Sequence, residues 1–185
     1  MLRAAAELGR DEQPELYLHV HPHGRATASL ARAFAAVLRP RGGPTLDEIA
    51  LGAHLHDFGK YLLPKSLLLK PGPLSEEERA VVTLHPVYGN QVLSGLTAIT
   101  EAVRQVVLYH HERWDGTGYP EGLQGTRIPL TVRIVSIADV YASLRARRSY
   151  KPTLTKRAAV AEMEAMAGRE LDPDLTADFL KFVWL

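Results

Sequence analysis

The chain has 185 residues, of which 46% are hydrophobic and 23% are charged, and its formal net charge at pH 7 is +1. These values are typical of one globular domain and do not favour a polymeric nucleic acid as partner. The absence of cysteine excludes disulfides and thiolate ligands, so any metal must be held by nitrogen and oxygen donors. No apolar run has membrane-spanning length and no signal-peptide core is visible, so we expect a cytoplasmic protein without membrane contact.

The first predicted helix carries an apolar stripe from Leu30 to Leu38. Pro22 is expected in its first turn, where the missing N–H costs nothing. Residues 1–14 are predicted to form a loose tail, and residues 15–185 a single domain.

Two capping boxes predict the next helices. Thr45–Glu48 opens a helix that runs toward residue 57, and a short helical turn is expected around residues 65–69. Ser75–Glu78 opens a further helix. Its predicted buried face consists of Val81, Leu84, Tyr88 and Val92.

The second half of the chain also alternates helices with marked breaks. Thr97 is predicted to cap a helix with an inward stripe ending at His110, and a glycine-rich loop follows over residues 112–128. Pro129 starts the next helix, and the last two cover roughly residues 155–167 and the segment after Asp172. The predicted fold class is therefore all-α, a single compact bundle of about seven helices.

Histidine is the unusual residue, with eight copies, most of them clustered. In His56-Asp57-Phe58-Gly59-Lys60, the imidazole and the carboxylate at a helix end can converge on one cation. Gly59 lets the chain turn back and bring Lys60 near. The alternative interpretation of this pentapeptide is a polar helix end on the surface.

Further donors lie at inward positions. His85 and the pair His110-His111 follow apolar stripes, and a buried imidazole needs a partner, which a metal would supply. Asp139 interrupts the apolar segment 134–141, which favours a metal ligand over a buried salt bridge to Lys60 or an arginine.

The N-terminal histidines are less clear. His23 falls within the predicted first helix, and His19 would share its face if the helix reached back that far. His54 is interpreted as a surface or partner histidine, and His21 is assigned no role. The loop from Glu112 can fold over a site and place Tyr119 beside a ligand, or it can be a solvated turn.

Together these residues resemble the HD-GYP family, a branch of the HD-domain phosphohydrolases. The resemblance covers nearly the whole chain, about residues 23–179. Its motifs are His56-Asp57-x-Gly59-Lys60, His85-Pro86, His110-His111-Glu112-x-x-Asp115-Gly116-x-Gly118-Tyr119-Pro120, Asp139 and Arg148-x-Tyr150-Lys151.

The resemblance implies a bacterial helical domain that hydrolyses cyclic di-GMP to pGpG and/or GMP with two or three divalent metals. Iron or manganese is expected, and zinc also suits these donors. Asp57 would bridge two metals, and His19 stands where trinuclear members have a glutamate ligand. The implied ligands are His23, His56, Asp57, His85, His110, His111 and Asp139, with His19 as a further ligand if a third metal binds.

The resemblance also implies roles for other residues. Lys60 would stabilise the transition state or protonate the leaving group, and Arg148 and Lys151 would clamp phosphates. Tyr119 and Gly118 would shape the nucleotide pocket. Two departures stand out: Gly24 replaces a frequent serine after the first ligand, and Ala142 replaces a common aspartate.

Two other functions remain open. The chain could be an HD-domain hydrolase of another nucleotide or cyclic dinucleotide, which a substrate panel would distinguish. It could also be a catalytically weak module that binds cyclic di-GMP and signals through a protein partner or self-association. The sequence shows no receiver or sensor domain, so we expect regulation to come from elsewhere.

Overall fold

The computed structural model describes residues 14–38, 43–146 and 153–184, with side chains in the first range from Val20 onward. Regular structure in these ranges is helical apart from two isolated β-bridges, which confirms the predicted all-α class. The helices are Pro14–Leu38 (α2), Leu46–Leu55 (α3), Phe58–Leu62 (η1), Lys65–Leu68 (α4), Glu76–Val82 (α5), His85–Ser94 (α6), Glu101–Tyr109 (α7), Gly125–Arg127 (η2), Leu130–Arg145 (α8), Lys156–Met166 (α9) and Pro173–Trp184 (α10), where η marks a 3-10 helix.

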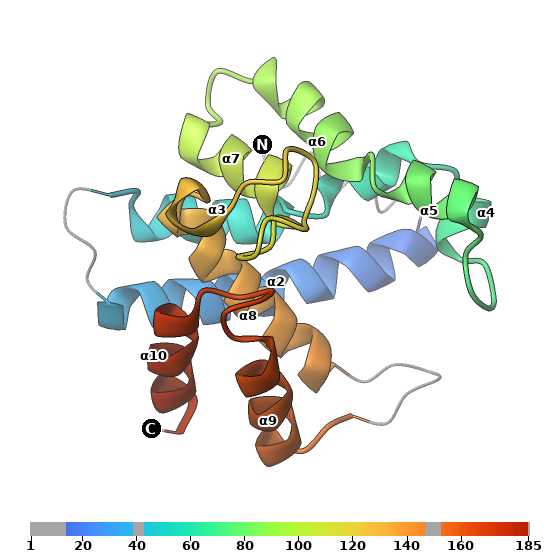
Figure 1. The fold of residues 1–185 in the computed structure, drawn as a ribbon. Coiled ribbons are helices and arrows are strands. Elements are labelled where there is room, and N and C mark those ends of the chain that lie inside the picture. Colours follow the sequence, from blue (N-terminus) through green and yellow to red (C-terminus); the bar gives the residue numbers. More distant parts are fainter. Residues whose placement is uncertain (1–13, 39–42, 147–152, 185) are drawn as a thin grey trace.

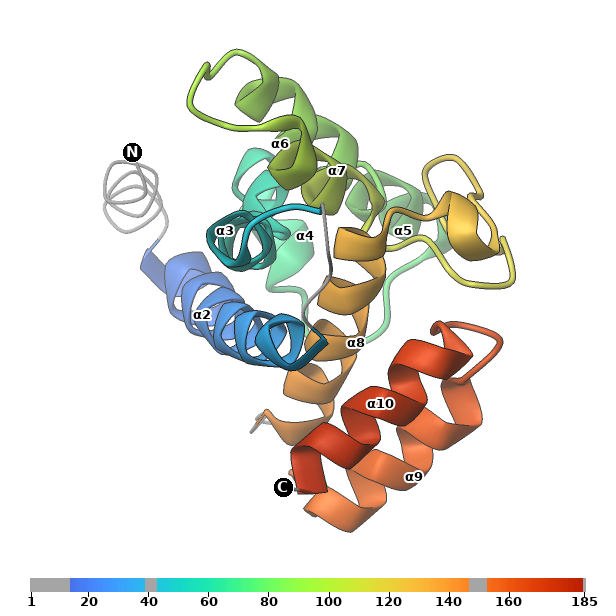
Figure 2. The ribbon, with the colours of Figure 1, turned by 90° about the vertical axis from the view of Figure 1, so that its left-hand side faces the viewer.

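Helix α8 crosses the long helix α2 near the middle of the bundle (Figure 1). Helices α3 and α7 pack against one another and against α8, while α9 and α10 form a separate pair on its C-terminal side (Figure 2). The main core lies between these layers, where the rings of Phe34 and Phe179 meet edge to face with centroids 5.0 Å apart. A smaller apolar cluster around Val103 and Val107 joins α7 to α3 and α6.

Helix α2 starts earlier than predicted. Pro22 lies inside this 25-residue helix and not in its first turn, so that expectation was wrong. The helix continues through the proline because one missing backbone hydrogen bond is a local loss, whereas the helix packs against both α3 and α8 along its length. His19 and His23 therefore belong to one continuous helix.

Both predicted capping boxes are confirmed. The side chains of Thr45 and Ser75 each accept a hydrogen bond from the backbone N–H three residues later. The carboxylates of Glu48 and Glu78 in turn accept one from the backbone N–H of Thr45 and Ser75. The predicted cap at Thr97 was wrong, because α7 starts only after Thr100.

The predicted buried face after Ser75 was also wrong. Val81, Leu84 and Val92 are 37%, 38% and 45% exposed. The expected single helix is broken into α5 and α6 at Thr83 and Leu84, which changes the direction of every later side chain. Pro86 is in the first turn of α6, the position that suits proline.

No helix in the described ranges has the length and hydropathy that crossing a bilayer requires. Residues 1–13 lie outside the described part, so the predicted tail stays a prediction.

Candidate metal centre

The predicted donors converge where several helices end. They come from α2 (His23), the C-cap of α3 (His56), the residue before η1 (Asp57), the start of α6 (His85), the end of α7 (His110 and His111) and the middle of α8 (Asp139). Within the described residues they form two groups whose ligand atoms lie within 4.8 Å of one another. The four-donor group is Asp57, His85, His110 and His111, and the three-donor group is His23, His56 and Asp139.

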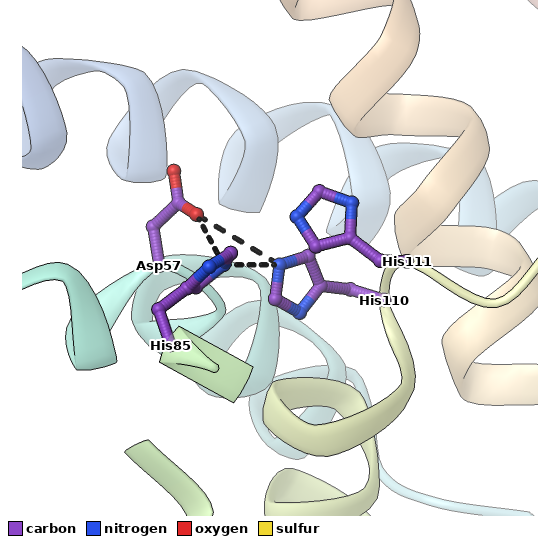
Figure 3. A group of neighbouring side chains, drawn as sticks. All are labelled: Asp57, His85, His110 and His111. Atoms are coloured by element: carbon purple, nitrogen blue, oxygen red, sulfur yellow. Dashed lines mark hydrogen bonds and ion pairs between the residues drawn. The ribbon is translucent and has the colours of Figure 1, made fainter. Parts of the chain in front are cut away.

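Figure 3 shows the four-donor group, in which Asp57 faces the two imidazoles of His85 and His110. The Oδ1 atom of Asp57 lies 3.3 Å from Nε2 of His85 and 3.8 Å from Nε2 of His110. The ring of His111 lies beside that of His110, with centroids 4.2 Å apart. His85 and His110 are almost completely buried, at 1% and 4% exposure. The group is thus a compact set of nitrogen and oxygen donors, of which Asp57, His85 and His110 are buried and His111 is partly exposed.

The backbone sets the orientation of three of these rings. In His56, His85 and His110, Nδ1 lies 2.7, 2.8 and 3.0 Å from the carbonyl oxygen three residues earlier. A carbonyl oxygen only accepts hydrogen bonds, so each Nδ1 carries the proton and donates it. In a neutral ring, Nε2 then presents its lone pair toward the centre of the site, as a metal ligand must.

The three-donor group is built around Asp139. Its Oδ1 atom lies 2.6 Å from Nε2 of His23 and 3.6 Å from Nε2 of His56. Among the described residues Asp139 pairs with these two histidines, and not with Lys60 or an arginine, which was the expected alternative. Lys60 instead places its ammonium 2.6 Å from Oδ2 of Asp57.

Asp57 connects the two groups. Its Oδ1 faces the four-donor group, while Oδ2 lies 3.4 Å from Nε2 of His56 in the three-donor group. One carboxylate therefore offers an oxygen to each side, which is the arrangement that a bridging ligand requires.

Burial and charge act against each other in this site. Burial alone would raise the pKa of Asp57, but the cations of Lys60 and His56 hold it well below its usual value. Burial would lower the pKa of His56, but the carboxylates of Asp57 and Asp139 outweigh it and raise the pKa to about 9. Burial and the neighbouring histidines lower the pKa of His110 strongly and that of His111 to about 3. At neutral pH His110 and His111 are thus neutral imidazoles beside the carboxylate of Asp57.

Two glycines allow the helices to approach closely enough to build the site. A Cβ atom on Gly59 would lie 1.8 Å from the backbone oxygen of His85, so a side chain there would push α6 away from η1. A Cβ atom on Gly24 would lie 2.6 Å from the backbone oxygen of His54, where α2 meets α3. The departure from serine at position 24 thus coincides with a close contact between the helices that carry His23 and His56.

The glycine-rich loop lies directly on the site. Tyr119 stacks on the ring of His111, with centroids 4.8 Å apart and planes inclined by 24°. Its backbone N–H donates to the carbonyl oxygen of His111 over 3.3 Å. A Cβ atom on Gly118 would lie 2.4 to 2.6 Å from backbone atoms of residues 111–113, so only glycine fits there. Tyr119 and Gly118 therefore lie at the site, as the resemblance implies.

The donor set fits a metal on its own chemistry. The Nε2 atoms of His85 and His110 lie 3.2 Å apart, and with both Nδ1 atoms donating, two lone pairs face each other in the neutral rings. A divalent cation between such groups relieves this repulsion, and histidine and carboxylate donors without thiolate suit iron, manganese or zinc.

Some predicted residues cannot be placed. Arg148 and Lys151 lie outside the described residues, and the side chain of His19 is also outside them. His21 and His54 contact each other, with ring centroids 4.9 Å apart, and belong to neither donor group. Ala142 is buried on α8, one turn after Asp139. Glu112 belongs to the motif, but the sequence predicted no role for it. Its side chain is 4% exposed and accepts hydrogen bonds from the backbone of the loop.

Comparison with known proteins matches the HD domain family over residues 12–175. The chain therefore belongs to the HD-domain family. The curated relatives that follow confirm the resemblance to its HD-GYP branch. The response regulator RpfG of Xanthomonas campestris, a cyclic di-GMP phosphodiesterase, is 47% identical over 126 residues, 68% of this chain and 33% of its own length.

A cyclic di-GMP phosphodiesterase of Vibrio cholerae is 36% identical over 97% of this chain and 38% of its own. From the same organism, 3′3′-cGAMP-specific phosphodiesterase 2 is 41% identical over 70% of this chain and 25% of its own. The chain thus spans about a quarter to two fifths of the length of these relatives. Among solved structures, Bd1817, an HDG"Y"P protein from Bdellovibrio bacteriovorus, has a TM-score of 0.72 at 22% identity, covering 90% of this chain and 53% of that one, which shows the shared fold.

Proposed function

We propose that the chain is a metal-dependent phosphodiesterase that hydrolyses cyclic di-GMP to pGpG and/or GMP. The observation that carries this proposal is the position of Asp57, whose two oxygens face two adjoining sets of donors. Cyclic di-GMP hydrolysis is the activity named for the relatives from Xanthomonas campestris and, at 36% identity, Vibrio cholerae.

The proposed ligands are His23, His56, Asp57, His85, His110, His111 and Asp139, with His19 for a third ion. Two bound divalent ions, iron or manganese first, would supply a hydroxide nucleophile near neutral pH and offset the charge of the phosphate. A cytoplasmic location stays a prediction.

The chain's own groups have separate tasks in this proposal. Lys60 donates a hydrogen bond from Nζ to Oδ2 of Asp57 and is the candidate to stabilise the transition state or to protonate the departing 3′-oxygen. Tyr119, fixed on His111, offers one wall of the nucleotide pocket. Arg148 and Lys151 are proposed to bind the phosphates, Arg148 with two parallel hydrogen bonds.

The test is turnover of cyclic di-GMP by protein loaded anaerobically with iron or manganese, with metal content and products measured on the same sample. We expect pGpG or GMP to accumulate with wild-type protein, whereas Asp57→Ala and His56→Ala abolish turnover and lower bound metal. Full activity in both variants would show that the site is elsewhere. For Arg148→Ala we expect weaker substrate binding with metal retained.

The second candidate is hydrolysis of another cyclic dinucleotide, which the 41% identity to the 3′3′-cGAMP-specific enzyme favours. Parallel assays with 3′3′-cGAMP and cyclic di-GMP decide between the two by the ratio of kcat/KM. Tight binding of cyclic di-GMP without any hydrolysis in the metal-loaded protein would instead support the binding module.

A further inference from the structure

Glu112 closes the loop that follows the two histidines of α7. Its Oε1 accepts the backbone N–H of Glu121 over 2.8 Å, and its Oε2 accepts that of Leu123 over 3.0 Å. The side chain is 4% exposed, so these bonds are formed largely out of water. Each oxygen is engaged by the loop, and Glu112 is not among the ligand atoms of either donor group.

The closed loop carries the residue that touches the site. Tyr119 lies two residues before Glu121 and stacks on His111, the residue directly before Glu112. Gly118 packs against the backbone of residues 111–113 without room for a Cβ atom. The chain therefore leaves His111, turns, and returns to it, and the carboxylate of Glu112 joins the two ends of the turn.

We propose that Glu112 is a positioning residue that holds the ring of Tyr119 against His111 by binding the backbone on the far side of the loop. The inference deepens the proposed function, because it assigns the arrangement of the proposed nucleotide pocket to a side chain outside both donor groups. A buried carboxylate that accepts two N–H groups fixes a loop strongly, since leaving these donors unpaired would be unfavourable.

Two variants of Glu112 that remove one or both of its hydrogen bonds to the loop test this positioning role. In Glu112→Gln the amide keeps one acceptor oxygen, but its NH₂ group faces an N–H donor, so one of the two bonds is lost. In Glu112→Ala both are lost. We expect kcat/KM for cyclic di-GMP to fall about tenfold in the first and about a hundredfold in the second, the size of effect that a misplaced binding wall produces. Metal content should equal that of wild type.

A double-mutant cycle tests whether the effect passes through Tyr119. If Glu112 acts by positioning this ring, Glu112→Ala in a Tyr119→Ala background should cost less than about twofold further. Val160→Ala, a truncation of a buried residue in α9, is the control for stability, and it should leave kcat/KM unchanged at a matched loss of melting temperature. Additive losses in the cycle, or loss of metal from Glu112→Gln, would overturn the proposal.

Hydrogen exchange provides a measurement that does not require turnover. In wild-type protein the amides of Glu121 and Leu123 should be protected, and Glu112→Ala should raise their exchange rate about tenfold or more while α8 stays protected. Unchanged exchange would refute the positioning role even in an active enzyme. If Glu112→Ala loses protection as expected but the wild-type protein hydrolyses no cyclic dinucleotide, the proposed function is refuted. The link between Glu112 and the loop then still holds.

Discussion

His85 and His110 point their Nε2 atoms at each other across 3.2 Å, while the Nδ1 atom of each donates to the backbone carbonyl oxygen three residues earlier. In the metal-free protein this contact is favourable only if one ring takes up a second proton, and burial with the neighbouring histidines lowers the pKa of His110 strongly. A cation bound between the two nitrogen atoms would remove this unfavourable contact.

Metal removal should accordingly destabilise the fold. With free manganese at 100 times its Kd, the free energy of unfolding should exceed that of the chelator-treated protein by about 2.7 kcal/mol. Denaturant titration with and without metal measures this difference. The matched control is the His85→Ala/His110→Ala protein, in which the gain should shrink sharply. An equal gain in this variant would show that the stabilising ion binds elsewhere.

The pH dependence of metal binding should differ between the two groups. In the metal-free protein His56 has a pKa of about 9, so at pH 7 a metal must displace its proton, whereas His110 and His111, with lowered pKa values, are already neutral. Affinity of the three-donor group should rise about tenfold per pH unit from 7 toward 9. Calorimetry in two buffers of different ionisation enthalpy should detect about one proton released for this ion. Binding of both ions without proton release would contradict the assignment.

The raised pKa of His56 also determines how the stability of the metal-free protein changes with pH. Because the pKa of His56 in the folded state lies above its unfolded value of 6.5, its protonation stabilises the metal-free fold fully below that value. This contribution is lost as the pH rises toward 9. Chelator-treated protein should therefore lose stability between about pH 6.5 and 9, and His56→Gln should flatten this part of the curve.

Local signals in the sequence predicted the start of α3 and of α5, because a capping box is formed by residues only three positions apart. They failed at Thr97, where Thr100 is an equally suitable cap. The exposed Leu84 and Val92 were misplaced because the helix breaks just before His85, although Pro86 marked a possible helix start.

The candidate site was predicted from the order and spacing of its motifs. Two features of the site could not be predicted from the sequence, since they depend on tertiary packing. One is the division of the donors between the two oxygens of Asp57, and the other is the contact between Glu112 and the backbone of Glu121.

Lys60 should matter for turnover and not for metal binding. Lys60→Met removes the ammonium 2.6 Å from Asp57, and we expect kcat to fall by about 10²- to 10⁴-fold with metal content retained. The depressed pKa of Asp57 rests first on this cation, so in metal-free protein the stability lost as the pH falls below the unfolded value of 3.8 should be smaller in the variant. Lys181→Met, at an exposed lysine on α10, is the control. Metal loss in Lys60→Met would mean that the ammonium supports the ligands instead.

Gly24 offers a test of how helix spacing sets the three-donor group. Gly24→Ser restores the residue frequent in the family, but its Cβ atom would lie 2.6 Å from the backbone oxygen of His54. Because α2 must then move away from α3, we expect a loss of about 1–3 kcal/mol in the free energy of unfolding. His23 would also shift from His56, whose ring centroid is now 5.3 Å away. The variant should lose the ion of this group first and keep the ion of the four-donor group. Gly43→Ser, where a Cβ atom meets nothing within 4 Å, is the matched control. Unchanged stability and metal content in Gly24→Ser would show that α2 can shift without cost and that serine is equally suited to this position.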